Sequence, residues 1–229
     1  MSTPIISVII PAFNEEQSIG KVVTDIPRDL VQNVIVVNNN STDNTVQVAS
    51  DAGAIVLDEP RKGYGWACLK GIEKSKELNT QIVVFLDGDY SDYPEEIIDV
   101  VRPILEEDHD MVIGSRVLGK REKGSLTPQQ VFGNWLATRL MRIFYRARFS
   151  DLGPFRAIKA DSLEKLKMSD KTYGWTIEMQ IKAAKHKMKF CEVPVKYRKR
   201  IGVSKVSGTV KGTVLAGIKI IGAIFKYRF

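Results

Sequence analysis

The stretch Val83-Val84-Phe85-Leu86-Asp87-Gly88-Asp89-Tyr90-Ser91-Asp92 joins an apolar run directly to three acids. Short runs rich in β-branched residues are typical of strands buried on both faces of a parallel sheet. Three carboxylates within six residues repel one another, so the cluster costs stability unless a cation lies among them. Mg²⁺ and Mn²⁺ take oxygen ligands and bridge phosphates. We predict a divalent-metal site on Asp89, Asp87 and Asp92; the alternative is a solvated Asp-rich turn.

Similar apolar runs precede and follow this stretch, at 5–10, 34–37, 54–57 and 111–113. Helix-like segments lie between them: Ser41 is a plausible N-cap for a helix through Ala49, and Pro94 fits the first turn of a helix that reaches Leu105. Strands that alternate with helices predict an α/β fold with a mostly parallel, Rossmann-like sheet. Ligands of such sheets bind beyond the carboxyl ends of the strands.

The alternation of predicted strands and helices stops at Gly114. A polar loop at 120–128 is followed by a helix at 129–148, a strand within 153–159, a helix at 175–187, a strand at 189–197 and a last helix from Thr209. We therefore predict one domain over 1–208, with a first half at 1–114 and a second half at 115–208. Residues 209–229 form a basic amphipathic helix in this prediction.

Composition narrows the class of protein. The 229 residues are 44% hydrophobic and 27% charged, which suits one large folded domain. Cys68 and Cys191 are the only cysteines, which favours a reducing compartment and excludes a disulfide scaffold. No secretory leader is apparent, and Lys219 interrupts the longest apolar stretch, so we expect no membrane span.

Charge is unevenly placed along the chain. From Lys182 onward there are thirteen Lys or Arg and one acid, Glu192, whereas residues 1–181 carry a net charge of −5. Such a basic tail is suited to phosphates, lipid headgroups or nucleic acid.

Polar residues also follow the first and second predicted strands. The first runs into Pro11-Ala12-Phe13-Asn14-Glu15-Glu16 and the second into Asn38-Asn39-Asn40-Ser41-Thr42-Asp43. These are the positions where a nucleotide would lie above the sheet. Taken alone, each segment is equally compatible with ordinary turn and cap chemistry.

Taken together, the motifs resemble family-2 glycosyltransferases, and among them the dolichyl-phosphate mannose synthases and their bacterial polyprenyl-phosphate relatives. The resemblance rests on the segments just quoted and continues through the second half of the chain, in the runs 62–65, 114–116, 151–156, 174–179, 192–195 and 200–205. It implies a GT-A fold, a nucleotide-sugar donor, a divalent metal and inversion at the anomeric carbon. It also implies that 1–114 is the nucleotide-sugar-binding half of the domain and 115–208 the acceptor-side half.

The resemblance also assigns roles on the donor side. Asp89 would hold the metal on the donor diphosphate, and Asp87 would contact the ribose or act on the metal indirectly. The implied donor-binding residues are Pro11, Phe13, Glu15, Asn39, Lys62, Gly63, Asp87 and Gly88. Asn38 and Asn39 stand where many members have two acids, which leaves uridine and guanosine both open. Ser91 and Asp92 replace a common Gln-His pair, and Asp92 is the candidate for an extra metal ligand.

The acceptor can be argued from charge. A lipid phosphate is already an anion and needs positioning rather than a base. Arginine suits that task. The candidate acceptor-binding residues are three arginines and two nearby polar residues, namely Arg116, Arg121, Arg200, Ser204 and Lys205. A solvated basic face is the alternative. The family tends to have an Arg where this chain has Gln129-Gln130-Val131, which weakens the phosphate-acceptor assignment.

A hydroxyl acceptor would need a general base. Asp151 and Glu178 are the candidates, and for each the alternative is a structural hydrogen-bond acceptor.

The last helix carries apolar residues at helical spacing, namely Val210, Val214, Ile218, Ile221 and Phe225, with Lys211, Lys219, Lys226 and Arg228 beside them. Such a helix is expected to lie in a membrane interface. The alternative is that the stripe packs on the protein's own core.

These observations predict a cytoplasmic enzyme, peripheral at an anionic membrane surface, that moves a hexose from a UDP- or GDP-linked donor to a polyprenyl or dolichyl phosphate. The other candidates are transfer to a sugar or lipid hydroxyl and a non-enzymatic basic module. Nucleic acid is not an expected partner, because the acidic strand end would repel phosphates that no metal bridges, and no aromatic-and-basic binding motif is present.

Overall fold

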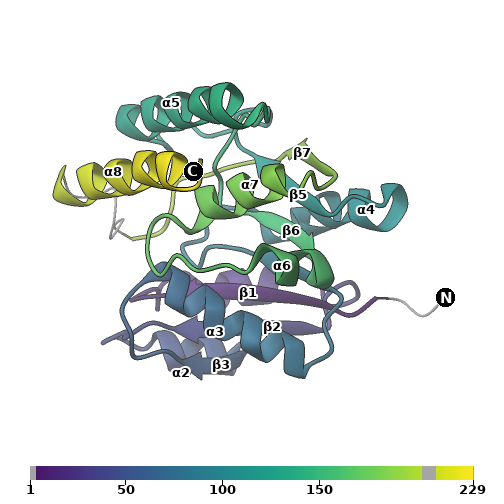
Figure 1. The fold of residues 1–229 in the computed structure, drawn as a ribbon. Coiled ribbons are helices and arrows are strands. Elements are labelled where there is room, and N and C mark those ends of the chain that lie inside the picture. The colour runs from purple at the N-terminus through teal and green to yellow at the C-terminus, as the bar shows by residue number, and fades with distance from the viewer. Residues whose placement is uncertain (1–3, 203–209, 229) are drawn as a thin grey trace.

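A seven-stranded sheet runs through the computed structural model, which describes residues 4–202 and 210–228 (Figure 1). Its spatial order is β3-β2-β1-β4-β6-β5-β7. Only β6 is antiparallel to its neighbours β4 and β5; the other described pairs are parallel. The strands are β1 (Ile6–Ala12), β2 (Asn33–Asn38), β3 (Ile55–Asp58), β4 (Ile82–Phe85), β5 (Met111–Ser115), β6 (Arg156–Lys159) and β7 (Phe190–Pro194). The predicted mostly parallel α/β sheet is confirmed.

Helices cover both faces of this sheet. The described helices are α1 (Ile19–Asp25), α2 (Thr45–Asp51), α3 (Tyr64–Glu77), α4 (Ile97–Glu107), α5 (Pro128–Tyr145), α6 (Ala160–Leu166), α7 (Trp175–Lys185) and α8 (Val210–Lys226), with a 3₁₀ turn η1 (Pro94–Glu96) before α4. One core cluster joins the sheet to α1, α2 and α4, and the other joins it to α3, α5, α6, α7 and α8. Figure 1 shows α5 and α8 side by side in the outermost layer, away from β3.

The alternation of side chains along β1 explains why two cores form. Val8 and Ile10 lie in the first cluster, whereas Ile9 lies in the second, and all three are fully buried. Successive residues of a strand point to opposite faces, so an uninterrupted apolar run supplies both cores at once.

The predicted cap at Ser41 is wrong. Helix α2 begins at Thr45, whose backbone N–H donates to Asp43 Oδ1 at 3.1 Å. The Ser41 hydroxyl instead accepts from the backbone N–H of Asn14 at 3.0 Å. It therefore joins the loop after β1 to the loop after β2, at the edge of the sheet where a ligand is expected.

The C-terminal helix packs partly on the core. Ile224 of α8 is fully buried, its backbone carbonyl accepts from Tyr145 Oη at 2.5 Å, and the rings of Phe144 and Phe225 have centroids 5.3 Å apart. Ile218 nevertheless stays 62% exposed. The core-packing alternative is therefore correct for one face of α8, and an apolar residue remains on another.

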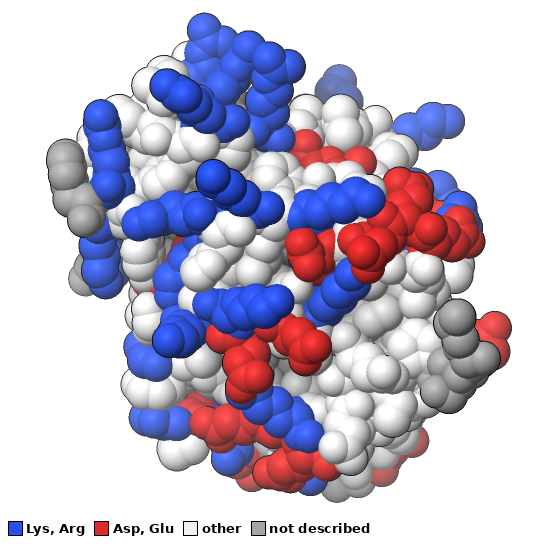
Figure 2. Space-filling model, turned by 45° about the vertical axis from the view of Figure 1, so that its right-hand side comes forward, with Lys and Arg blue, Asp and Glu red and all other residues white. Residues whose placement is uncertain are grey.

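Basic side chains gather at the same end of the molecule. Those on the surface of α5, α8 and their flanks are Arg139, Arg142, Arg146, Arg148, Lys219, Lys226 and Arg228. In Figure 2 Lys and Arg side chains form a blue cap at the top, level with α5 in Figure 1, while most acids on this face lie lower. None of the described helices is both long enough and apolar enough to span a membrane.

Candidate active site

A cavity of about 310 Å³ opens beyond the carboxyl ends of β1, β2 and β4. All the residues predicted to bind the donor line it: Pro11, Phe13, Glu15, Asn39, Lys62, Gly63, Asp87 and Gly88. Asp89, Tyr64, Tyr173 and Arg200 complete the polar part of the lining. Because the three strands are parallel neighbours, their ends bring together segments that are up to about eighty residues apart in the sequence.

Asp87 and Asp89 form the acidic wall of this cavity. Asp87 accepts a hydrogen bond from Tyr64 Oη at 3.1 Å. Burial and then the charge of Asp89 raise the pKa of Asp87 to about 7. Asp89 Oδ1 accepts from both the backbone N–H and the hydroxyl of Ser91, at 2.9 and 2.5 Å. A cation placed beside these two acids would relieve their mutual repulsion.

Asp92 lies behind this wall rather than in it. It is 1% exposed, and within the described part of the chain neither carboxylate oxygen has a hydrogen-bond partner. Burial and the charge of Asp87 raise its pKa well above the ordinary value. A buried carboxylate without a partner is costly, and such groups need a specific explanation.

The predicted set of three metal ligands is not a preformed cage. Within residues 4–202 and 210–228, no three acidic, His or Cys side chains converge as a metal group would require. Mg²⁺, however, is commonly held by one or two carboxylates together with substrate phosphates and water. Asp87 and Asp89 border the cavity and fit that arrangement, whereas Asp92 does not reach the lining.

Asn39 shapes the cavity with its side-chain amide. Its Nδ2 donates to the carbonyls of Glu59 and Arg61 at 2.9 and 2.8 Å, and its Oδ1 accepts from Gly63 N at 2.7 Å. These contacts hold the 59–63 loop against β2. Gly63 has φ 146°, and a Cβ there would lie 2.2 Å from the carbonyl oxygen of Lys171. Only glycine allows this close approach of the two loops.

Arg200, which was predicted to hold the acceptor, lines the same cavity as the predicted donor-binding residues. Its Nη1 is 3.1 Å from Asp89 Oδ2, and its Nη2 is 3.0 Å from Glu15 Oε1. The reason is that Ile201 N donates to the carbonyl of Asp89, so the chain after β7 packs directly on the loop after β4. Arg121 is exposed and does not line the cavity, and Ser204 and Lys205 lie outside the described residues.

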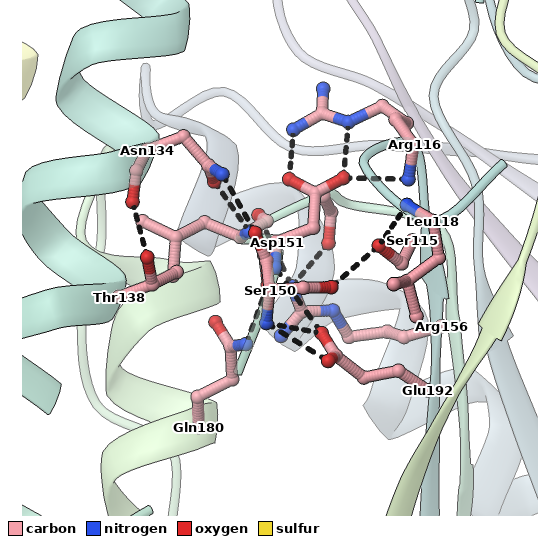
Figure 3. Close-up of polar contacts among 12 residues, drawn as sticks. Ser115, Arg116, Leu118, Asn134, Thr138, Ser150, Asp151, Arg156, Gln180 and Glu192 are labelled. Atoms are coloured by element: carbon pink, nitrogen blue, oxygen red, sulfur yellow. Dashed lines mark hydrogen bonds and ion pairs between the residues drawn. The ribbon is translucent and has the colours of Figure 1, made fainter. Parts of the chain in front are cut away.

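Arg116 and Asp151 form an ion pair with each other (Figure 3). Arg116 donates from Nε and Nη2 to the two oxygens of Asp151 at 2.8 and 2.7 Å, and its backbone N–H donates at 2.8 Å. Burial alone would raise the pKa of Asp151, but the charge and hydrogen bonds of Arg116 hold it below its ordinary value. Neither residue lines the cavity. Asp151 is therefore poorly suited to act as a general base.

A second set of contacts fixes the loop that carries Asp151. Glu192 accepts from Ser150 N with both oxygens at 2.9 Å. Asn134 of α5 donates to the carbonyl of Ser150 and accepts from Leu152 N, each at 2.9 Å (Figure 3). Sequence reasoning gave Asn134 and Glu192 no role. One signal was present for Glu192, which is the single acid in a strongly basic stretch.

Glu178 supports the cavity from behind. It is fully buried and accepts from Ser169 N, Asp170 N and Tyr227 Oη, at 3.0, 2.7 and 2.6 Å, while Lys182 Nζ lies 2.7 Å away. Burial opposes ionisation, but hydrogen bonds from Lys182, Ser169 and Tyr227 lower the pKa of Glu178 to about 2. We assign Glu178 to holding the 169–171 loop, which meets Gly63, and not to proton transfer.

A model of glycosyl transferase family 2 matches residues 7–167, about 70% of the chain. The chain belongs to this family. The matched region contains the predicted donor-binding residues and ends before α7, β7 and α8.

Two curated relatives of this family-2 glycosyltransferase carry informative names. One is the UDP-N-acetylglucosamine–dolichyl-phosphate N-acetylglucosaminyltransferase of Methanococcus voltae, 29% identical over 219 residues, or 86% of each chain. The other is the undecaprenyl-phosphate mannosyltransferase of Micrococcus luteus, 27% identical over 225 residues, or 92% of this chain and 90% of the relative. The predicted resemblance to polyprenyl-phosphate glycosyltransferases is confirmed.

A solved structure shows that the fold is GT-A. The glucosyl-3-phosphoglycerate synthase of Mycobacterium tuberculosis, in complex with Mn²⁺, UDP and glucosyl-3-phosphoglycerate, superposes with a TM-score of 0.77. It is 22% identical, and the match covers 98% of this family-2 glycosyltransferase and 80% of that chain.

Proposed function

We propose that this glycosyltransferase moves a hexose, with inversion, from a UDP- or GDP-linked donor to a polyprenyl or dolichyl phosphate at a membrane surface. The observation that carries the proposal is the cavity beyond β1, β2 and β4, which has Asp87 and Asp89 in its wall and all the predicted donor residues in its lining. The names of the Methanococcus and Micrococcus relatives support the lipid-phosphate acceptor.

The donor's diphosphate would lie at the acidic wall through a divalent metal. Asp89, with Asp87 beside it, would hold this metal, and when bound it would neutralise charge on the departing nucleotide diphosphate. The Mycobacterium tuberculosis synthase carries Mn²⁺ with UDP, which supports such an ion in the family. Asn39 and Gly63 keep the 59–63 loop and the 169–171 loop in contact at the other end of the cavity.

The partners of the two candidate bases favour a phosphate acceptor. Asp151 is bound by Arg116, and Glu178 is enclosed by donors of its own chain. An acceptor phosphate needs no base, because its oxygen is already ionised at neutral pH. Its oxygen would form the bond to the anomeric carbon while the bond from that carbon to the donor diphosphate breaks, so no proton has to move.

The outer layer of helices supplies a face for the membrane. On α5, Phe132, Trp135 and Ile143 are 61%, 56% and 62% exposed, and the rings of Phe132 and Trp135 have centroids 5.8 Å apart. On α8, Ile218 and Phe225 are 62% and 45% exposed. Exposed arginines and lysines lie on the same two helices and their flanks. Apolar side chains among basic ones are suited to an anionic lipid interface.

Transfer itself is the direct test. A radiolabelled sugar on UDP or GDP, incubated with Mn²⁺ and a short polyprenyl phosphate, should appear in the organic phase. Omitting the lipid phosphate or replacing it with the matching polyprenol should abolish the signal. Equal transfer to the polyprenol would contradict the phosphate acceptor, and no transfer to either lipid from any donor would contradict the proposal.

The membrane face has its own test, made with point variants because Ile224 and Tyr227 tie α8 to the core. Trp135→Ser combined with Ile218→Ser should leave the melting temperature nearly unchanged and reduce flotation with anionic liposomes at low salt. Val46→Ser, a change at a 38% exposed apolar residue of α2, is the matched control. Unchanged flotation of the double variant would place membrane contact elsewhere.

A further inference from the structure

Arg200 bridges two strand ends within the donor cavity. Its guanidinium contacts Asp89 Oδ2 at 3.1 Å and Glu15 Oε1 at 3.0 Å. The side chain is 27% exposed and lines the cavity, and its Nε is buried with no hydrogen-bond partner among the described residues. One cation of the chain thus lies directly against the carboxylate that best fits a divalent ion.

The hydrogen bonds of Asp89 determine which of its oxygens a metal could bind, and Arg200 contacts that oxygen. Its Oδ1 is already taken by the backbone N–H and hydroxyl of Ser91. Its Oδ2, the oxygen left for a metal, is the one that Arg200 contacts. A divalent cation on that oxygen would meet a positive guanidinium at the same atom, and like charges at this separation repel strongly in a partly buried site.

The backbone around Arg200 is held in place, so only its side chain has to move. Arg198 stacks 3.4 Å from the ring centroid of Tyr90 and donates to the carbonyls of Tyr90 and Asp92, at 2.7 and 3.1 Å. On the other side, Ile201 N donates to the carbonyl of Asp89 at 2.9 Å. These anchors fix the distance from the Arg200 backbone to the acidic wall.

We propose that Arg200 is an internal counter-cation that keeps divalent metal off Asp89 until a nucleotide diphosphate enters. The diphosphate gives the guanidinium another anion to bind, which frees Asp89 Oδ2 for the metal. Metal and nucleotide therefore bind cooperatively, and the nucleotide-free enzyme excludes the ion. This inference rests on the proposed function, because it takes the metal at Asp89 from there.

Electron paramagnetic resonance of Mn²⁺ tests the inference without measuring activity, since the six-line signal of free Mn²⁺ is lost on binding. The wild-type chain should retain Mn²⁺ weakly alone and strongly with UDP or GDP. Arg200→Gln should retain Mn²⁺ without nucleotide roughly tenfold to a hundredfold more tightly than wild type, the value of a hydrogen bond to a charged group. Lys199→Gln removes the same charge from an exposed neighbour and should match wild type.

Two further variants keep the experiment decisive. Arg200→Lys retains the charge but not the two-pronged contact, so its affinity for Mn²⁺ alone should lie between wild type and Arg200→Gln; it also replaces Arg200→Gln if that variant does not fold. Adding Asp89→Asn to Arg200→Gln should remove the gained affinity.

Equal Mn²⁺ affinity of wild type and the Arg200 variants without nucleotide, with nucleotide-dependent binding intact, would overturn the inference alone. Absence of Mn²⁺ binding in every variant, with either nucleotide, would overturn the proposed metal site and the inference with it.

Discussion

Acids near the cavity have opposite surroundings in the segment after β4 and in the layer behind the cavity. At the end of β4, Asp87 accepts one hydrogen bond and Asp92 accepts none from the described residues, and the pKa of each is raised. Behind the cavity, Asp151 and Glu178 have cationic partners and several hydrogen bonds, and the pKa of each is lowered. A paired buried acid contributes to the architecture, whereas an unpaired one costs stability and requires a ligand to explain it.

The largest effect should come from breaking a pair behind the cavity. Asp151→Asn leaves the largely buried guanidinium of Arg116 without its counter-ion and should lower the free energy of unfolding by about 3–5 kcal/mol. Urea denaturation measures this loss. Adding Arg116→Gln should restore much of the stability, because both charges are then removed. A loss under about 1 kcal/mol for Asp151→Asn would show that the pair is not structural.

At the acidic wall, a substitution should remove activity and spare the fold. Asp89→Asn should reduce the rate of sugar transfer about 100- to 1000-fold, the scale seen when one preorganised electrostatic contact is lost. Its melting temperature should stay within a few degrees of wild type. A variant that melts normally and keeps more than a tenth of the wild-type rate would remove Asp89 from the metal site.

The same contrast should appear in the way the free energy of unfolding depends on pH. Glu178 has a pKa of about 2 in the folded chain and an ordinary value near 4 when unfolded, so its contribution is present above about pH 4 and is lost as the pH falls toward 2. Glu178→Gln should flatten the stability profile in that window. Asp87, with its raised pKa, acts in the opposite direction and adds stability as the pH falls from about 7 to 4. Urea midpoints across pH 2–8 measure both slopes, and a wild-type profile that Glu178→Gln leaves unchanged would contradict this account.

The smallest expected effect is a gain in stability. Asp92→Asn replaces the unpartnered buried carboxylate with a neutral group of the same shape and should stabilise the chain by about 1 kcal/mol at pH 8. The gain should shrink as the pH falls, because the raised pKa of Asp92 means that its neutral form costs less at lower pH in the folded wild-type chain. Thermal melting at pH 8 and pH 5 is sufficient, and a loss of stability at pH 8 would show that Asp92 has a cationic partner in the folded chain.

The lining of the cavity was predictable because it follows from strand ends. A buried strand that runs into Asp87 and Asp89 fixes both the edge of the sheet and its chemistry, and parallel neighbours bring Glu15 and Asn39 to the same edge. The hydrogen bonds of Asn39 were not predictable, because its amide contacts a loop that lies 20 to 24 residues further along the chain.

The second half of the chain was harder because its residues meet through tertiary packing. Arg116 and Asp151 are 35 residues apart, and they pair only because the 150–152 loop returns beside the end of β5. Arg200 was assigned to the acceptor because its segment follows the donor half, yet the chain after β7 folds back onto the loop after β4. No local sequence pattern predicts either of these tertiary contacts.

Carboxyl-carbon NMR of the metal-free chain, titrated from pH 2 to pH 9 with resonances assigned by Asp87→Asn and Glu178→Gln, tests the central contrast most directly. Asp87 should titrate near pH 7 and Glu178 near pH 2, as unpaired and paired surroundings require. Addition of Mg²⁺ with the bound nucleotide diphosphate should then shift the Asp87 titration to lower pH and leave Glu178 unchanged. Titration of both carboxyls near pH 4, with no response of Asp87 to the metal and nucleotide, would contradict the account.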